Sequence, residues 1–254
     1  MRVVSIVLLL CGCGRNNEDI HIQGMDHNVL SGDDLIERYS ERDLASHQKG
    51  RPYEIVKDET FGRHMVASRD IAAGEIVMED FPLTFGPMVS SAVKPLCLGC
   101  YRPLERGRRV DCERCGWPLC SEQCGERPGH RDFECGLFQE KQFRLDTTNW
   151  DYSATEAAYN VISPLRALIL RDRDPERFSL IWGLMSHNEA RRKEEYWVSK
   201  HAAIIKYIRE VVGATEFTEE DIDTILGIFL VNDFEINAKI DEEEWSSGEI
   251  LKIC

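Results

Sequence analysis

Seven of the ten cysteines in this 254-residue chain lie in one short segment, residues 97–135. With one histidine they form closely spaced pairs of potential metal ligands: Cys97, Cys100, Cys112, Cys115, Cys120, Cys124, His130 and Cys135. Spacings of two to four residues let one turn of backbone present two ligands to the same ion. Eight such ligands fill two tetrahedral sites. The segment therefore predicts two structural zinc ions, with no open position for a catalytic water.

The spacing leaves two questions open. The first four ligands could hold one ion and the last four the other, or the pairs could alternate between the two ions. A disulfide framework is the competing interpretation, but disulfides usually spread along the chain that they staple, whereas these cysteines are clustered. Because so short a segment buries little apolar surface, metal binding would supply much of its folding free energy, about 10 kcal/mol or more per site.

Charge favours protein partners over nucleic acid. The chain has 31 Lys and Arg against 45 Asp and Glu, a formal net charge of −14. Within residues 97–135, seven arginines balance seven acidic residues, so seven thiolates and two Zn²⁺ would leave a net charge of −3. Phosphate binding needs clustered positive charge. We therefore expect no direct contact with nucleic acid and a cysteine segment that docks on proteins.

Short β-type runs precede the cysteine segment, at 53–56, 64–67, 75–79 and 83–85. After it, apolar residues recur with a helical period from about residue 136. Two predicted helices begin at Ser153 and at Ser163, and three more cover 175–187, 191–211 and 219–231. The last helix is the clearest, because Thr218 can cap it. Gly213 is the expected stop of the helix before it.

The two ends of the chain differ in character. Residues 3–11 are mostly apolar, but a bilayer span needs about 20 residues, so they suggest a signal peptide or a buried strand and no membrane segment. They belong to an N-terminal extension, 1–50, in which 32–46 predicts a short helix. Residues 238–254 predict an acidic, solvated tail. A reduced zinc–thiolate cluster favours the nucleus or cytoplasm, with secretion as the alternative.

The order of the ligands resembles the MYND zinc finger, and the stretch GRHMVASRDIAAGEIVMEDFPLTFGP at 62–87 resembles the opening of a SET domain. A MYND finger inserted into SET and followed by helices is the layout of the SMYD protein-lysine methyltransferases, and the chain resembles their arthropod members over about 53–237. The resemblance implies an α+β fold. A partial SET β-fold at 53–90 would carry the inserted finger at 97–135, and a helical block with the start of the SET core would follow at 140–237.

In that family the finger is a cross-brace, in which the first and third ligand pairs share one zinc ion and the second and fourth share the other. By resemblance, Cys97, Cys100, Cys120 and Cys124 form one site, and Cys112, Cys115, His130 and Cys135 form the other. The resemblance also implies S-adenosylmethionine as cofactor. Phe61, Gly62 and Arg63 match the loop that lies against it, and His187 and Asn232 match two further contacts.

The family's Asn-His-x-Cys-x-Pro-Asn stretch and active-site tyrosine are expected beyond Asn237 and do not occur in this sequence. The resemblance therefore implies a chain truncated within SET, with no catalytic residue and no activity of its own. A complete form would methylate lysine in histones or other proteins and act in chromatin and transcription regulation. The alternative is a non-catalytic adaptor or corepressor that docks proline-rich peptides, whose extended helix is preformed for a shallow groove.

Overall fold

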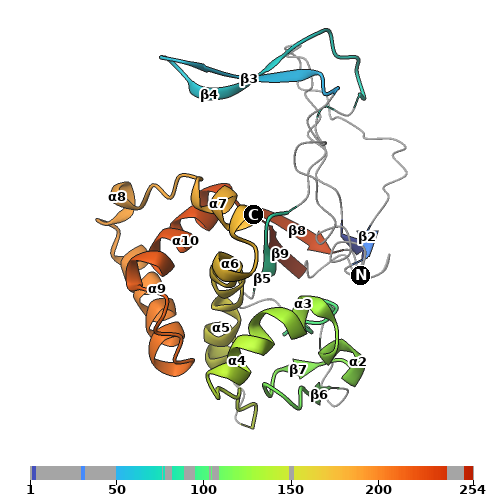
Figure 1. The fold of residues 1–254 in the computed structure, drawn as a ribbon, viewed down its shortest axis with the longest axis vertical. Helices are drawn as coiled ribbons and strands as arrows, with labels where there is room; N and C mark the ends of the chain where they lie inside the picture. Colours follow the sequence, from blue (N-terminus) through green and yellow to red (C-terminus); the bar gives the residue numbers. More distant parts are fainter. Residues whose placement is uncertain are drawn as a thin grey trace. The chain divides into compact units, whose positions relative to one another are not determined.

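The computed structural model describes residues 2–3, 30–31, 50–75, 77, 82–88, 95–102, 104, 109–148, 152–238 and 249–253. The chain divides into two compact units, Val3–Phe81 on one side and Met1–Arg2 with Pro82–Cys254 on the other, and each is described by itself (Figure 1). The expected helix at 32–46 and nearly all of the apolar stretch at 3–11 lie outside the described residues. Two short strands, β1 (Arg2–Val3) and β2 (Leu30–Ser31), are assigned near the N-terminus.

The unit Val3–Phe81 contains an antiparallel hairpin of β3 (Tyr53–Asp58) and β4 (Gly62–Ala67), in register from Tyr53 opposite Ala67 to Asp58 opposite Gly62. The strands predicted at 53–56 and 64–67 are confirmed and extend toward the turn. Asp58 closes that turn, since its Oδ1 accepts hydrogen bonds from the backbone N–H of Thr60 at 2.8 Å and of Phe61 at 2.7 Å. Of the strand expected at 75–79, residues 75 and 77 are described and neither lies in a strand.

The other unit contains a three-stranded antiparallel sheet in the order β5 (Phe85–Met88), β9 (Glu249–Ile253), β8 (Phe234–Ala238). The strand expected at 83–85 thus begins at Phe85. The expectation of a solvated tail at 238–254 was wrong for its last part, because β9 is the central strand and pairs with both neighbours. Three of the five residues in EILKI are apolar. The prediction of a solvated tail gave more weight to the acidic composition of the whole stretch than to this apolar run.

The cysteine segment lies between β5 and β8 in the sequence. It and the residues that follow it form short elements: β6 (Val110–Asp111), β7 (Pro118–Leu119), α2 (Glu122–Gly125), α3 (Pro128–His130), a π-helical turn (Arg131–Cys135) and α4 (Gly136–Glu140). Strands β6 and β7 form a two-stranded antiparallel sheet. The π-helical turn of this segment contacts the helix Ile162–Arg173 of the block that follows.

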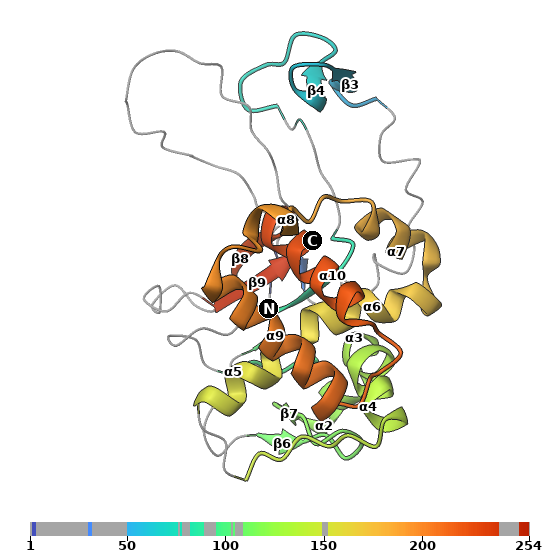
Figure 2. The same ribbon diagram turned by 90° about the vertical axis from the view of Figure 1, so that its left-hand side faces the viewer.

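The helical block consists of α5 (Tyr152–Asn160), α6 (Ile162–Arg173), α7 (Pro175–Trp182), α8 (Asn188–Arg191), α9 (Glu195–Lys206) with a π-helical turn (Tyr207–Val211), and α10 (Glu219–Asn232). Helix α6 lies at its centre, in contact with β5, α5, α7 and α10 (Figure 2). Its residues from Ile162 to Leu170 are all buried. The mixture of helices and small sheets is an α+β arrangement, and none of the helices in the described part of the chain has the length and apolar character that crossing a bilayer requires.

Three helix boundaries differ from the sequence prediction. Helix α6 begins at Ile162, so Ser163 is not its cap and Pro164 lies in the first turn, where a missing N–H costs no hydrogen bond. The segment 175–187 is helical only to Trp182, because the chain turns at Gly183 and takes a left-handed conformation at His187, with φ of 52°. The segment 191–211 is divided, since α9 begins at Glu195.

Helix α10 is the prediction that the structure confirms most closely. Thr218 caps it in a capping box, in which the Thr218 hydroxyl accepts from the N–H of Asp221 at 3.0 Å and the Asp221 carboxylate accepts from the N–H of Thr218 at 3.0 Å. Gly213, with φ of +82°, ends the preceding helical stretch as predicted.

Replacing Thr218 by Ala removes one half of this box. We expect Thr218→Ala to lower the free energy of unfolding by about 1 kcal/mol, because an N–H of the first turn loses its partner, and Thr218→Ser to stay close to wild type. Urea unfolding followed by circular dichroism measures both. Equal stability of the Ala and Ser variants would contradict the capping assignment.

Candidate metal centre

The first two ligand pairs lie on turns with the same backbone shape. In each Cys-x2-Cys turn the N–H after the second cysteine donates to the carbonyl of the first, Tyr101 to Cys97 at 2.6 Å and Gly116 to Cys112 at 2.8 Å. Both donors have left-handed φ, 59° at Tyr101 and 75° at Gly116. Glycine takes this conformation without strain, and a Cβ on Gly116 would lie 2.6 Å from the Leu145 carbonyl oxygen. The bulky Tyr101 takes it at a cost.

The other two pairs come from the segment that follows. Cys120 comes directly after β7, and Cys124 lies within α2. The first turn approaches α2 so closely that a Cβ on Gly99 would lie 2.3 Å from the backbone oxygen of Cys124. His130 ends α3 and Cys135 ends the π-helical turn after it. The local backbone therefore brings the two ligands of each pair close together, and the path of the chain decides which pairs meet.

The structure brings the eight ligands together as two groups of four, with the ligand atoms of each group within 4.8 Å of one another. The groups are Cys97, Cys100, Cys120 and Cys124, and Cys112, Cys115, His130 and Cys135. This is the alternating order that the resemblance implies and not the sequential one. Every ligand is buried except Cys120, which is partly exposed.

The distances fit a metal ion better than a disulfide. A tetrahedral zinc ion with Zn–S bonds of about 2.3 Å and a Zn–N bond of about 2.0 Å separates two sulfurs by about 3.8 Å and a sulfur from a nitrogen by about 3.6 Å. In the second group Cys112 Sγ lies 3.8 Å from Cys135 Sγ, and Cys115 Sγ lies 3.6 Å from His130 Nε2. The first group is tighter, with 3.3 and 3.4 Å from Cys120 Sγ to its neighbours, far beyond a sulfur–sulfur bond of about 2.05 Å.

The electrostatics of both groups link metal binding to proton release. Hydrogen bonding with the Cys124 thiol, together with burial, raises the pKa of Cys100 to about 12. Burial disfavours the charged form of His130, yet hydrogen bonding with two thiols and Glu134 raises its pKa to about 11. Zinc binds the deprotonated forms of both residues, so it must displace at least one proton from each group at neutral pH.

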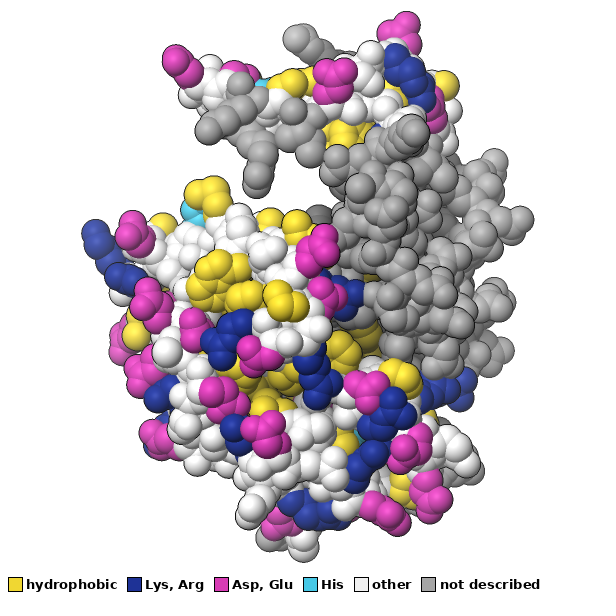
Figure 3. All heavy atoms as spheres, viewed as in Figure 1, with side chains coloured by type: hydrophobic (Ala, Val, Ile, Leu, Met, Phe, Trp, Pro, Cys, Tyr) yellow, Lys and Arg dark blue, Asp and Glu magenta, His cyan; other side chains and the backbone are white. Residues whose placement is uncertain are grey.

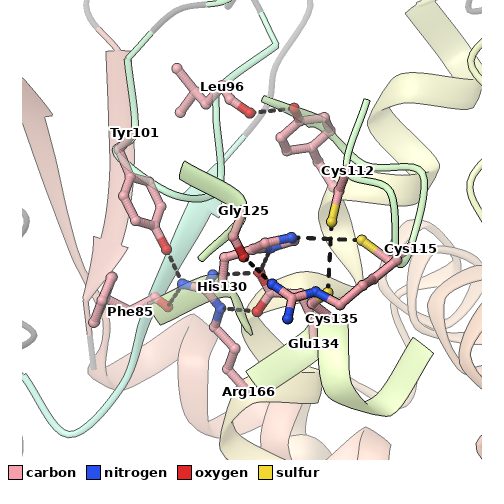
Figure 4. Close-up of polar contacts among 12 residues, drawn as sticks. Phe85, Leu96, Tyr101, Cys112, Cys115, Gly125, His130, Glu134, Cys135 and Arg166 are labelled. Carbon is pink, nitrogen blue, oxygen red and sulfur yellow. Dashed lines mark hydrogen bonds and ion pairs between the residues drawn. The ribbon is translucent and has the colours of Figure 1, made fainter. Parts of the chain in front are cut away.

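A buried carboxylate and a buried guanidinium support the second group from outside (Figure 4). His130 Nδ1 lies 2.9 Å from Glu134 Oε1, and Arg166 Nε lies 2.7 Å from Glu134 Oε2. Sequence reasoning missed both residues. The spacing of four residues from His130 to Glu134 and the single Arg within the apolar run ISPLRALIL were the available signals.

The residues expected to contact S-adenosylmethionine are divided between the two units. In the hairpin unit, Phe61 lies in the turn and is 74% exposed, while Gly62 and Arg63 begin β4 and pair with Asp58 and Lys57. The other two residues belong to the helical block. The role of these five residues stays a prediction.

In the helical block, Asn232 contacts the loop that carries His187. Asn232 ends α10, and its side-chain N–H groups donate to the carbonyls of Met185 at 3.0 Å and Ile228 at 2.8 Å. Met185 lies two residues before His187. His187 directly precedes α8, and its side chain is exposed. Asn232 thus holds the loop that carries His187.

No family model matches the chain. Over 109 residues, 43% of this chain and 21% of the relative, it is 28% identical to SET domain-containing protein SmydA-8, isoform A, of Drosophila melanogaster. It is 37% identical to isoform B of that protein over 83 residues, 31% of this chain and 18% of the relative. It is 33% identical to histone-lysine N-methyltransferase ASHR2 of Arabidopsis thaliana over 67 residues, 25% of this chain and 17% of the relative. The match thus spans about a fifth of the length of each relative.

The affinity for zinc is expected to rise with pH, because deprotonated Cys100 and His130 are the forms that bind. One displaced proton per ion changes the affinity tenfold per pH unit, so lowering the pH from about 7.5 to about 5.5 should weaken each site at least about 100-fold. Competition with a fluorescent zinc indicator at each pH measures this change. A pH-independent affinity would contradict the assignment of these two ligands.

Proposed function

The similarity to SET domain-containing proteins, one of them a histone-lysine methyltransferase, supports the SMYD and SET family for this chain, and we propose that it serves S-adenosylmethionine-dependent methylation of protein lysines. In this proposal residues 97–135 are a MYND-type finger that binds two zinc ions and docks protein partners. The observation that supports the finger is the pair of four-ligand groups in alternating order.

The donor sets point to structural zinc. Four thiols, or three thiols and an imidazole, are the ligands of closed tetrahedral sites. Since the protein supplies all four positions, the ions would hold the shape of the finger and perform no chemistry.

The finger and the helical block share one core. Trp117 is fully buried in the finger, stacked on Phe138 of α4 at a ring distance of 5.7 Å and in edge contact with Tyr159 of α5 at 5.2 Å. The Tyr159 hydroxyl also donates to the carbonyl of Leu96, next to the first ligand. These contacts support a finger that presents its partner to the helical block in a set orientation.

Surface charge supports a protein partner. On the face shown in Figure 3, Lys and Arg side chains are interspersed with Asp and Glu and form no continuous basic surface. Together with the net charge of −14 this argues against phosphate backbones as ligands. We place the protein in the nucleus or cytoplasm, where thiolate ligands stay reduced.

S-adenosylmethionine would supply a methyl group on a positively charged sulfur. By resemblance the backbone of Phe61, Gly62 and Arg63, with His187 and Asn232, would hold it. Transfer to lysine requires the amine to be deprotonated and aligned with that methyl group. The proposal therefore assigns these five residues to cofactor binding.

The first test is elemental analysis with a methyl-transfer assay. The full chain should contain two zinc ions, and Cys120→Ser should lower the content to one, whereas Cys254→Ser, a cysteine outside 97–135, should leave it at two. A chain without zinc but with disulfides would refute the finger and favour the secreted alternative. Labelled S-adenosylmethionine with histones and cell extract tests whether the chain transfers a methyl group by itself. The resemblance implies an inactive chain, so turnover by the isolated chain would overturn that implication.

The second candidate function is a non-catalytic adaptor, favoured by the closed ligand sets of the finger. A proline-rich peptide labelled with a fluorophore should bind wild type and Cys254→Ser alike and lose at least tenfold in affinity with Cys120→Ser, because the loss of one ion disorders the docking surface. Fluorescence anisotropy measures the three affinities. Equal binding by all three would count against docking through the finger.

A further inference from the structure

The second ligand group is linked to the rest of the unit through one buried carboxylate. Glu134 is fully buried, and so is His130. The Nδ1 atom of His130 faces Glu134 Oε1 at 2.9 Å, while its Nε2 atom faces the thiol of Cys115 at 3.6 Å. In the neutral imidazole that ligates a metal, a carboxylate that accepts from one ring nitrogen holds the single proton there and leaves the other nitrogen free to bind the ion. Glu134 therefore selects the tautomer in which His130 Nε2 points into the ligand group.

The same carboxylate binds Arg166 on the opposite side. Arg166 is 2% exposed and holds Glu134 with two parallel bonds, Nε to Oε2 at 2.7 Å and Nη2 to Oε1 at 2.8 Å. This fork is the geometry that arginine prefers for carboxylates. Arg166 belongs to α6, 32 residues further along the chain, so the contact joins the finger to the central helix.

The remaining guanidinium nitrogen of Arg166 extends the link to the sheet. Nη1 donates to the carbonyl of Phe85 in β5 at 3.2 Å and also to the hydroxyl of Tyr101. The guanidinium carbon lies 5.4 Å from the ring centre of Phe85 and 5.6 Å from that of Tyr101. Figure 4 shows Phe85 of the strand and Tyr101 and Glu134 of the finger around the guanidinium of Arg166.

The ligand side chains of the first group have a different setting. Among the described residues, the contacts of its thiols run to one another, to the backbone of Cys120 and Arg102, and to the Ser121 hydroxyl, which lies 3.5 Å from Cys124 Sγ. Those partners belong to the finger itself. The first group is tied to its surroundings through neighbouring backbone, whereas the second is tied through a ligand.

We propose that Glu134 is a positioning residue that couples occupancy of the second metal group to the folding of α6 and β5. The proposal rests on the proposed zinc finger. A metal ion that holds His130 also holds the Glu134 carboxylate in line with the Arg166 fork. By thermodynamic reciprocity, an intact Arg166 fork strengthens metal binding at the second group as much as the metal strengthens α6.

Metal release from the full chain tests the positioning role. The variants are Glu134→Gln, which keeps an acceptor for His130 but loses the charge that pairs with Arg166, and Arg166→Lys, which keeps the charge but loses the fork. The matched control is Glu140→Gln, an exposed glutamate at the end of α4 that pairs with Lys141 at 3.1 Å. Zinc transfer to a chromogenic chelator gives the rates, and the absorption bands of the Co²⁺-loaded chain distinguish the group with nitrogen from the all-sulfur group.

We expect release from the nitrogen-containing group to speed up about 10- to 100-fold in Glu134→Gln and Arg166→Lys, with release from the all-sulfur group unchanged and with wild-type rates in Glu140→Gln. Equal acceleration at both groups would show general loss of stability and overturn the proposal. Wild-type rates at both groups in Glu134→Gln would overturn it as well.

Hydrogen exchange of the backbone tests the coupling to the fold. Cys115→Ser removes a ligand of the second group and Cys120→Ser a ligand of the first. We expect Cys115→Ser to raise exchange at least tenfold in peptides from Ile162–Arg173 and Phe85–Met88, and Cys120→Ser to leave those peptides near wild type. Equal exchange in the two variants would overturn the coupling while leaving a two-zinc finger intact. A wild-type chain that binds no zinc would overturn the finger and the coupling together.

Discussion

The ion pair between Glu134 and Arg166 is the constraint on which the rest of the larger unit depends. Taking both charges out of water costs several kcal/mol for each ion, and the pair is tolerated because each charged group has further polar partners. His130 binds the carboxylate, and the Phe85 carbonyl and Tyr101 hydroxyl accept from the guanidinium. Loss of either partner would leave a buried charge alone, at a cost of about 3–5 kcal/mol. One contact therefore joins a metal ligand, the central helix and the sheet.

This contact explains two local features that would otherwise be costly. Tyr101 has a left-handed backbone conformation that favours glycine. Its hydroxyl accepts a hydrogen bond from Arg166 and so connects the first ligand turn to α6. Helix α6 carries an arginine within an otherwise apolar, buried stretch. Together with the stacking of Trp117 on Phe138, these contacts make the finger a part of the core of the unit rather than a domain on a linker. Metal binding in the finger would then stabilise elements far from it in the sequence.

The proposed methyl-transfer function rests on different ground from the metal centre. The ligand groups are complete within one unit and their distances fit zinc. The expected cofactor contacts are split, with Phe61 in the hairpin and Asn232 at the end of α10. The curated relatives match over about a fifth of their length. The finger therefore carries the structural argument, and the family likeness carries the enzymatic one.

Residue type and short spacing determined the eight candidate ligands, the strands at 53–56 and 64–67 and helix α10, because ligand pairs, strand runs and caps are local signals. The same local signals misplaced the start of α6 and missed β9, since Ile162 and the run EILKI are set by what packs or pairs with them. Only the tertiary structure decided that the ligand pairs alternate and that Glu134 meets Arg166. Both depend on the path of the chain between residues 15 to 32 positions apart, which spacing alone does not specify.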